Sequence, residues 1–484
     1  MKIPIVNGIF TDDAADFRTS YPLNLIPVPK QTGINEGYLR TAEGMVLFCN
    51  NQVPGDDPFD RGAMAWDGIC YRVIGKYLVR VNENGLVDLL GEVGTDGKPV
   101  TMDNGFDYLS VSSAGDLYYC SKLGVVTKVT DPDAGLVIDH IWISGYTMIT
   151  DGATIAVTEL NDPFEVNPLK YGSSEASPDP IKRLFNIDNQ AVALNRLTTE
   201  FFANVGGSGF PFRRVEGAMI PKGCVGTFAA CEFQETFAFV GGGKKESTSV
   251  WIGAQGQAAK IATREIETIL GELTEAQQED IVLESRSEKM HEFLYMHLPD
   301  RTMVYDAAGS RVLGEPVWFT LQSALLGETN LPYRARYFVN CYGKWLFGDT
   351  LAPQVGYLTS KDARQFGQYV AWQFDTPLLY NESRGAIVHG LELVRLPGRR
   401  AVNPTLLYEE TRKAAIYHSY TEDGLNWSEP RPCGATRPGT TAARTTWRHL
   451  GRMRNYRGMR FRGMNNPYPD AFARLEANLE ALAA

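Results

Sequence analysis

The sequence contains no run of eighteen apolar residues, which a membrane-spanning helix would need. Its N-terminal segment also differs from a secretory signal peptide, because it is polar and is interrupted by Pro4 and Gly8. We therefore expect a protein that does not insert into a membrane.

Cysteine is scarce: the 484 residues include seven cysteines, and these do not form the closely spaced pairs of a zinc site. Cys224 and Cys231 lie closest together and lack a second pair. An odd, dispersed set in a long chain indicates reduced thiols and assembly in a reducing cytoplasm. The sequence thus predicts no metal and no cofactor.

The chain also lacks a convincing catalytic motif. Gly241-Gly-Gly-Lys-Lys is similar to a phosphate-binding loop, but Ala238 and Lys245 stand where that loop needs Gly and Ser or Thr. His291 and His297 would lie roughly 20 Å apart on one strand at about 3.3 Å per residue, too far to bind one metal. We interpret these segments as a hairpin turn and two structural histidines. No Gly-x-Ser-x-Gly elbow occurs, so no catalytic residue is predicted.

Helical periodicity is almost absent. Residues 263–281 are the exception, because Ile266, Ile269 and Leu270 fall on one helical face and Thr274 begins a capping-box pattern. The net charge of −10 argues against a general nucleic-acid binder, whose domain would be basic. The chain is therefore predicted to be mostly β.

A repeated hairpin dominates what the sequence does contain. Seven pairs of alternating apolar strands are separated by turn residues, at units roughly 30 to 56 residues apart. The turns fall near Gly75, 122–124, 151–152, 195–196, 241–243, 299–300 and 351–353. Units of this size favour a radial β-architecture. We predict a β-propeller of six or seven blades.

Composition and pattern divide the chain into four regions. Residues 1–60 are rich in proline and predict a loop-rich arm that packs over the domain or reaches a neighbour. Residues 61–364 predict the β-propeller, with the helical insert near 263–281. Residues 365–464 predict a C-terminal β-sandwich. The Ala-, Leu- and Glu-rich residues 465–484 predict a helical tail.

Residues 431–462 contain nine arginines and no acidic residue. Trp447, Met453, Met459 and Phe461 occupy odd positions in this stretch, and six arginines occupy even ones: Arg444, Arg448, Arg452, Arg454, Arg460 and Arg462. This alternation predicts a hairpin, turned near residues 455–458, with an apolar inner face and a guanidinium outer face. Because the stretch uses arginine alone, we predict an interface for an acidic protein partner, with DNA or a plain solvated surface as alternatives.

The segment Thr421-Glu-Asp-Gly-Leu-Asn-Trp resembles the Asp-box hairpin of sialidase propellers and of carbohydrate-binding domains. A single copy outside the repeats favours a structural turn. A sialidase-like glycosidase and a carbohydrate-binding propeller for host adhesion are kept as alternative functions.

Several segments together resemble the tail hub, or nozzle, proteins of short-tailed bacteriophages, also called packaged-DNA stabilisation proteins. They occur in the family's order and cover most of residues 16–464. The matching stretches are Asp16–Arg18, Gly37–Arg40, Tyr71–Val73, Lys170–Asp179, Thr199–Phe202, Ile266–Leu270, Glu284–Ser285, His297–Pro299, Val304–Ala307, Thr421–Asn426 and Trp447–Arg454.

The resemblance implies a non-enzymatic protein of the virion tail that forms a homohexameric ring below the portal and its adaptor ring. Such a ring retains packaged DNA, holds a tail needle, tailspike or tail fibres, and becomes the DNA ejection channel. DNA would pass through without sequence-specific binding.

Overall fold

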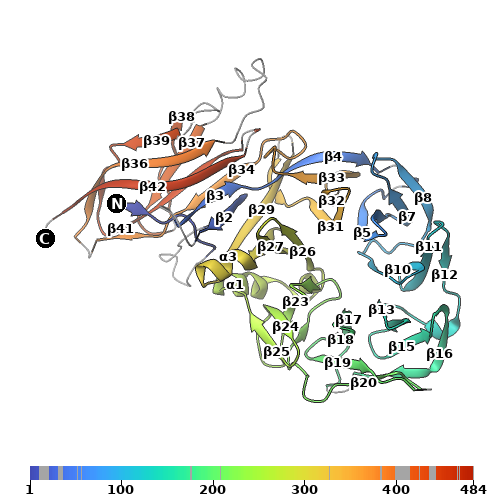
Figure 1. The fold of residues 1–484 in the computed structure, drawn as a ribbon. Helices are drawn as coiled ribbons and strands as arrows, with labels where there is room; N and C mark the ends of the chain where they lie inside the picture. The colour runs from blue at the N-terminus through green and yellow to red at the C-terminus, as the bar shows by residue number, and fades with distance from the viewer. Residues whose placement is uncertain are drawn as a thin grey trace.

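The computed structural model contains a ring of small antiparallel sheets, the β-propeller, beside a two-sheet β-sandwich (Figure 1). Asp16–Arg18 and Arg437 fall outside the residues that the structure describes. Those residues are 1–9, 21–30, 36–51, 53–55, 57–174, 177–207, 209–325, 328–381, 384–397, 415–424, 426–434, 443–465, 467 and 469–482.

The first four propeller sheets each contain four consecutive strands. The first contains β5 (Asp60–Trp66), β6 (Ile69–Ile74), β7 (Tyr77–Val81) and β8 (Val87–Glu92). The second contains β9 (Thr101–Asn104), β10 (Tyr108–Ser113), β11 (Asp116–Ser121) and β12 (Val126–Lys128). The third contains β13 (Asp139–Ile143), β14 (Tyr146–Thr150), β15 (Ile155–Glu159) and β16 (Asp162–Gly172). The fourth contains β17 (Ile181–Ile187), β18 (Gln190–Asn195), β19 (Thr199–Asn204) and β20 (Phe212–Arg214).

Three further sheets complete the ring formed by the described residues. One contains β21 (Gly223–Cys224), β22 (Ala230–Phe233), β23 (Thr236–Gly242), β24 (Ser249–Ala254) and β25 (Gln257–Lys260). The next contains β26 (Val282–Glu288), β27 (His291–His297), β28 (Thr302–Asp306), β29 (Trp318–Leu325) and β30 (Glu328–Pro332). The last contains β31 (Ala335–Cys341), β32 (Lys344–Asp349), β33 (Gln354–Thr359) and the N-terminal strand β4 (Gly44–Asn50).

The predicted hairpins are confirmed, and each of the seven predicted turns lies in a different sheet. The Asp151–Gly152 turn, for example, joins β14 to β15, with Gly152 at φ 92°. The turn at 122–124 joins the third and fourth strands of its sheet, whereas each of the others joins the second and third strands in sheet order. Alternating apolar residues and positive-φ turn residues therefore define the hairpins locally.

Ring closure depends on a strand that precedes the repeats. Inner strands of neighbouring sheets contact each other around the ring, as β5 does with β9 and β13 with β17, and β31 contacts β5. Strand β4 pairs with β33 as the outermost strand of that last sheet. The pairing covers an edge of β33 that would otherwise expose unpaired N–H and C=O groups.

The predicted helical insert is confirmed. Helix α1 (Arg264–Glu272) buries Ile266, Ile269 and Leu270, and α2 (Glu275–Glu279) begins with a capping box between Thr274 and Gln277. The sequence did not indicate α3 (Ala307–Leu313), which follows β28 and ends at Gly314, φ 78°. A 3-10 turn covers 132–134. None of the described helices is long and apolar enough to cross a membrane.

The sandwich takes its strands from both ends of the described chain. One sheet has the order β2 (Leu25–Pro29), β3 (Gly37–Thr41), β42 (Asp470–Ala481), β36 (Ala386–Pro397) and β39 (Ala443–Arg448), with β1 (Lys2–Ile3) on β42 and β40 (Arg452–Met453) on β36. The other has the order β34 (Ala371–Asp375), β41 (Tyr456–Met464), β37 (Ala415–Thr421) and β38 (Arg431–Gly434), with β35 (Leu379–Tyr380) on β41.

The helical tail prediction is wrong, because residues 470–481 form strand β42 in the centre of a sheet. Phe472, Leu475 and Ala477 are buried in the sandwich core, and the strand pairs with β36 along its length. Val394 pairs with Arg474 and Arg395 pairs with Phe472, so β42 has one extra residue at this point. The buried side chains of β42 therefore lie at even positions before the extra residue and at odd positions after it. Tertiary pairing thus overrides the helix propensity of Ala, Leu and Glu.

The region predicted as a loop-rich arm, residues 1–60, contains β1 to β4 and joins the two domains. The Asn24 side chain donates a hydrogen bond to the Ala371 carbonyl in the sandwich, at 2.7 Å. Its Oδ1 accepts one from the Gln322 N–H in the propeller, at 2.9 Å. The arm was expected either to pack over its own domain or to reach a neighbour, and these contacts show that it packs on its own chain.

Candidate interaction surfaces

The predicted alternation in the arginine stretch is confirmed, but the predicted hairpin is wrong. Strand β39 pairs with β36 in one sheet, whereas β41 pairs with β34 and β37 in the other. The two apolar faces therefore meet across the sandwich core, where the rings of Trp447 and Phe461 lie 5.3 Å apart. A hairpin would place both faces side by side in one sheet, where neither could cover the other.

This topology divides the six predicted arginines. Arg444, Arg448 and Arg452 lie on β39 and β40, on the outer face of the β36 sheet. Arg460 and Arg462 lie on β41, in the opposite sheet. Arg454 follows β40, where the chain crosses between the sheets. The six guanidinium groups therefore do not form one surface.

Mixed charges surround Arg444 on the face of the β36 sheet. Its guanidinium pairs with Glu392 at 2.8 Å, and its side chain is 63% exposed. His389 pairs with Glu480 at 2.7 Å on the neighbouring strands. Exposed pairs of this kind contribute about 0 to 1 kcal/mol, so this part of the face is a solvated, nearly neutral surface.

Arg448, Arg452 and Arg454 are exposed and have no ion pair among the described residues. We call residues 448–454 the arginine bend. His449, at φ 55°, and Gly451, at φ 79°, adopt left-handed conformations that turn the chain sharply between β39 and β40. The bend thus concentrates unpaired positive charge at one end of the sandwich.

Arg457 holds the arginine bend in place, although the sequence reasoning did not select it. Its side chain is 2% exposed and donates to the carbonyls of Leu450, at 2.8 Å, and Arg452, at 2.7 Å. It also pairs with Glu422 at 3.1 Å. The sequence does contain a sign of this role. Arg457 stands at an odd-numbered position, and the alternation assigns odd positions to the inward, apolar face of the strand.

Arg460 performs a structural role. It donates two hydrogen bonds to the carboxylate of Asp375, at 2.8 and 2.7 Å, and its guanidinium lies over the ring of Trp427. Arg462 is exposed and has no ion pair in the described part of the chain. Its strand neighbours are Tyr417 and Gln373. Of the six predicted arginines, Arg462 is therefore the one that lies on the outer face of the β41 sheet without an ion pair among the described residues.

The Asp-box segment forms a tight turn. Thr421 Oγ1 accepts hydrogen bonds from the N–H groups of Asp423, at 3.3 Å, and Gly424, at 2.8 Å. Gly424 has φ 74°. Asp423 Oδ1 accepts from the Asn426 N–H at 2.7 Å. These bonds stay within the turn, and they place Trp427 against Arg460 as a structural support.

The two histidines of β27 have separate partners. His291 Nδ1 lies 2.6 Å from Asp306 Oδ2, and His297 Nδ1 lies 3.1 Å from Thr302 Oγ1. Burial lowers the pKa of His297 well below its usual value, so its ring is neutral. The described residues include no group of three or more His, Cys, Asp or Glu side chains that could hold a metal ion.

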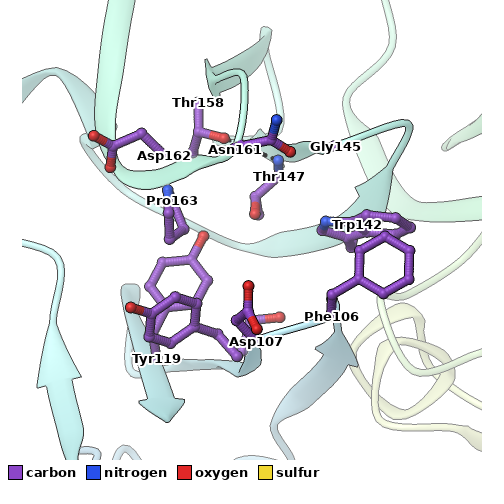
Figure 2. A pocket seen from close by; sticks show the side chains of 13 residues that line it. Phe106, Asp107, Tyr119, Trp142, Gly145, Thr147, Thr158, Asn161, Asp162 and Pro163 are labelled. Atoms are coloured by element: carbon purple, nitrogen blue, oxygen red, sulfur yellow. Dashed lines mark hydrogen bonds between the residues drawn. The ribbon is translucent and has the colours of Figure 1, made fainter.

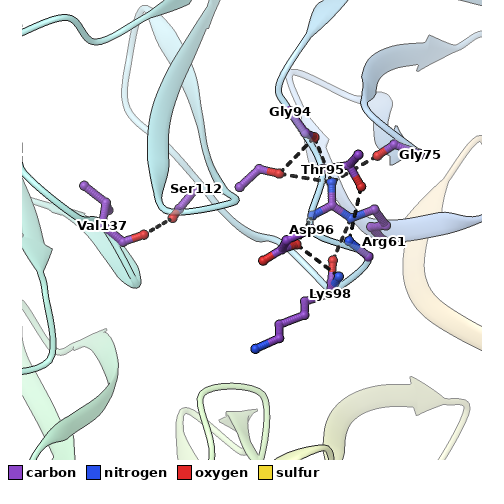
Figure 3. Close-up of polar contacts among 10 residues, drawn as sticks. Arg61, Gly75, Gly94, Thr95, Asp96, Lys98, Ser112 and Val137 are labelled. Carbon is purple, nitrogen blue, oxygen red and sulfur yellow. Dashed lines mark hydrogen bonds and ion pairs between the residues drawn. The ribbon is translucent and has the colours of Figure 1, made fainter.

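Arg61 fixes the connection between the first two propeller sheets (Figure 3). Its side chain is 4% exposed and donates to the carbonyls of Gly75, Gly94 and Lys98 at 2.6 to 3.0 Å. It also pairs with Asp96 at 2.8 Å. One buried arginine thus satisfies three carbonyl groups from two loops, the β6–β7 turn and the β8–β9 connection.

The inner strands carry acidic groups as well. Asp103 on β9 accepts hydrogen bonds from the N–H groups of Trp142, at 2.6 Å, and Asn104, at 2.7 Å. Burial nevertheless raises the pKa of Asp103 to about 6, and the nearby Glu232 carboxylate adds to the shift. Asp103 therefore titrates near neutral pH inside the ring.

Two family models match this architecture along the chain. The model described as "Bacteriophage P22 Gp10, beta-propeller" matches residues 1–363, and the one described as "Bacteriophage P22 Gp10, beta-sandwich" matches residues 371–480. The chain belongs to the bacteriophage P22 Gp10 family. The family assignment confirms both the predicted resemblance and the predicted fold class.

Within the Gp10 family, the chain is similar to the tail hub protein gp10 of Salmonella phage P22. The two are 26% identical over 480 residues, which cover 95% of this chain and 96% of the relative. This relationship supports a structural role as a tail hub and a place in the virion tail. It suggests a protein that is not an enzyme.

Solved structures resemble the Gp10-family chain only weakly. Virginiamycin B lyase from Staphylococcus aureus gives a TM-score of 0.42 at 11% identity, covering 66% of this chain and 98% of that chain. The N-terminal domain of Nup159 gives 0.39 at 11% identity, covering 70% and 99%. Likeness at this level carries no inference about function.

Proposed function

We propose that the protein is the tail hub of a short-tailed bacteriophage and forms a homohexameric ring below the portal and its adaptor ring. The ring retains packaged DNA, anchors a needle, tailspike or tail fibre proteins, and serves as the DNA ejection channel. The relationship to the P22 tail hub protein carries the proposal, because it spans both domains and 95% of the chain. The cysteines, all of them unpaired, are compatible with assembly in the host cytoplasm.

The N-terminal three quarters of the chain, which include the propeller, and the C-terminal quarter, which supplies most of the sandwich, carry opposite net charge. Residues 1–364 contain 46 acidic and 31 basic side chains, a net charge of −15, whereas residues 365–484 contain 11 and 16, a net charge of +5. Acidic propellers lining a channel would repel phosphate groups, so DNA would pass through without adhering. The basic sandwich is the part that attracts acidic partners.

The arginine bend is the surface that we assign to an acidic protein partner, either the adaptor ring or a neighbouring hub subunit. Arg448, Arg452 and Arg454 are exposed and lack ion pairs among the described residues. Arg457 holds their backbone rigid, so little conformational freedom is lost when a partner binds. Unpaired charges of one sign favour rapid association with a complementary surface.

The double variant Arg452→Glu, Arg454→Glu tests this interface in phage assembly. We expect a folded protein with an unchanged circular dichroism spectrum that is absent from purified virions. Arg444→Gln is the matched control, because that arginine lies on the same face but is already paired with Glu392. Normal incorporation of the double variant would contradict the interface role.

The hub role itself is tested by electron microscopy of virion tails. Images should show a six-fold ring with an axial hole, and an antibody against the protein should label it. Monomers in isolation are compatible with the proposal, because a hub can form its ring on the adaptor. Virions with complete tails that lack this protein would refute it.

A further inference from the structure

A small cavity opens between the second and third propeller sheets, outside the surfaces described above (Figure 2). Its volume is about 80 Å³. The turn after β9 supplies Phe106 and Asp107, and the turn after β15 with the start of β16 supplies Asn161 to Pro163. Because two sheets contribute, the cavity has preformed walls. We call it the Phe106 cavity.

One wall of the Phe106 cavity is aromatic. The Phe106 side chain is 77% exposed and packs edge-on against Trp142, with ring centroids 5.2 Å apart at 81°. Gly105 permits this contact, because a Cβ there would lie 2.9 Å from Trp142 Nε1. Asn186 Nδ2 donates to the Trp142 carbonyl at 3.1 Å and holds that strand in place. An ordered and largely exposed aromatic ring beside a cavity is a feature of binding sites.

A carboxylate without a partner faces this aromatic wall. The Asp107 side chain points into the cavity from the side opposite Thr147 (Figure 2). It is exposed and has no hydrogen bond or ion pair among the described residues. Tyr119, 2% exposed, adds a buried hydroxyl to the lining that has no hydrogen-bond partner among the described residues.

These groups favour a cation of the size of one side chain. Aromatic faces attract guanidinium and ammonium groups, and a carboxylate adds a charged hydrogen bond. The described residues of the lining include no lysine or arginine that could occupy the cavity from within. A volume of about 80 Å³ excludes a nucleotide or drug-sized molecule, since such ligands use roughly 300 to 1,000 Å³.

We infer that the Phe106 cavity receives an arginine side chain from the sandwich of a second copy of this chain. The charge complementarity lies within the chain, because the sandwich exposes Arg448, Arg452, Arg454 and Arg462 without ion pairs among the described residues, while the propeller bears the net negative charge. A contact of sandwich to propeller joins two different surfaces, as a cyclic ring requires. The choice of a second copy rests on the proposed hub function.

The first experiment tests the cavity alone, with Nα-acetyl-arginine amide as the probe and saturation-transfer NMR as the readout. We expect millimolar binding to the full-length protein and no binding of the uncharged isostere Nα-acetyl-citrulline amide. Asp107→Asn should weaken binding about tenfold, the loss of one charged hydrogen bond. Asp162→Asn is the matched control, because that carboxylate points away from the cavity (Figure 2). Absence of binding, or equal binding by Asp107→Asn, would overturn the inference.

The second experiment identifies the source of the arginine. Phe106 is replaced by p-benzoylphenylalanine, which suits a side chain that is already exposed, and virions assembled from isotopically light and heavy copies are irradiated. We expect mixed light–heavy adducts between residue 106 and residues 448–462. Adducts with a different virion protein would overturn the assignment to a second copy. Virions that lack the protein altogether would instead count against the hub function.

Discussion

Arg460 lies over Trp427, with its guanidinium carbon 3.8 Å from the ring centroid. The same guanidinium pairs with Asp375, which is 4% exposed. An arginine that the sequence assigns to a partner surface therefore connects the Asp-box turn to β34 within the sandwich.

This relationship predicts a loss of stability when Arg460 is removed. Arg460→Ala removes two charged hydrogen bonds from the buried Asp375 carboxylate, so the free energy of unfolding of the sandwich should fall by about 3 kcal/mol. Arg462→Ala, two residues along the same strand and unpaired among the described residues, should change it by no more than about 0.5 kcal/mol. Urea unfolding followed by tryptophan fluorescence measures both. Equal effects of the two variants would contradict the structural role of Arg460.

The arginine bend should loosen when Arg457 is replaced. Arg457→Met keeps the length of the side chain but removes its hydrogen bonds to the carbonyls of Leu450 and Arg452. Limited trypsin digestion should then cleave faster after Arg448, Arg452 or Arg454. Wild-type cleavage rates in the variant would show that the bend is rigid without Arg457. Arg462→Met is the control, because it makes the same replacement at an arginine of the same strand that does not contact the bend.

Two glycine substitutions should have opposite effects. A Cβ at Gly348 would lie 2.4 to 2.6 Å from the Asp60 side chain, which Arg72 holds at 2.9 Å. Gly348→Ala should therefore destabilise the closure between the first and last propeller sheets by about 1 to 3 kcal/mol. Gly271 in α1 has open space at its Cβ, so Gly271→Ala should stabilise by about 0.5 to 1 kcal/mol. Differential scanning calorimetry would detect either sign, and destabilisation by both would contradict the expected contrast.

Asp103 should make propeller stability depend on pH. Burial raises the pKa of Asp103 from 3.8 to about 6, so its contribution to stability is fully present below pH 3.8 and is lost as pH rises through 6. Asparagine does not ionise, so the Asp103→Asn variant should not lose stability as the pH rises through 6. The variant should gain about 1 to 3 kcal/mol relative to the wild type between pH 4 and pH 7.5.

Thermal unfolding at several pH values measures that difference. Asp107→Asn is the control, because the Asp107 carboxylate is exposed in the neighbouring turn. A constant difference between Asp103→Asn and the wild type across this range would show that Asp103 does not titrate there.

The sequence predicts those features that depend on neighbouring residues. The hairpin at Asp151–Gly152 and the buried face of α1 follow from turn chemistry and periodicity. The pairings of β4 with β33 and of β42 with β3 do not, because nothing local specifies a strand that lies hundreds of residues away. The alternation around Trp447 and Phe461 correctly gave the two faces of each strand. It could not distinguish a hairpin from two strands facing each other across a core.

The candidate site shows the same limit. The alternation of even and odd positions identified exposed arginines, such as Arg452. It could not show which arginines form ion pairs with Glu392 or Asp375 from other strands. The Phe106 cavity left no sequence signal, because its walls come from turns of two sheets.

Strand β4 also determines when the propeller can form during synthesis. Residues 44–50 pair with residues 354–359, so they leave the ribosome long before their partner exists. At about 5 to 20 residues per second, the wait is about 15 to 60 s. During that time β4 presents an unpaired edge that could pair with another nascent chain. Translation speed, and the spacing of ribosomes on the message, would therefore influence the yield of correctly closed propellers.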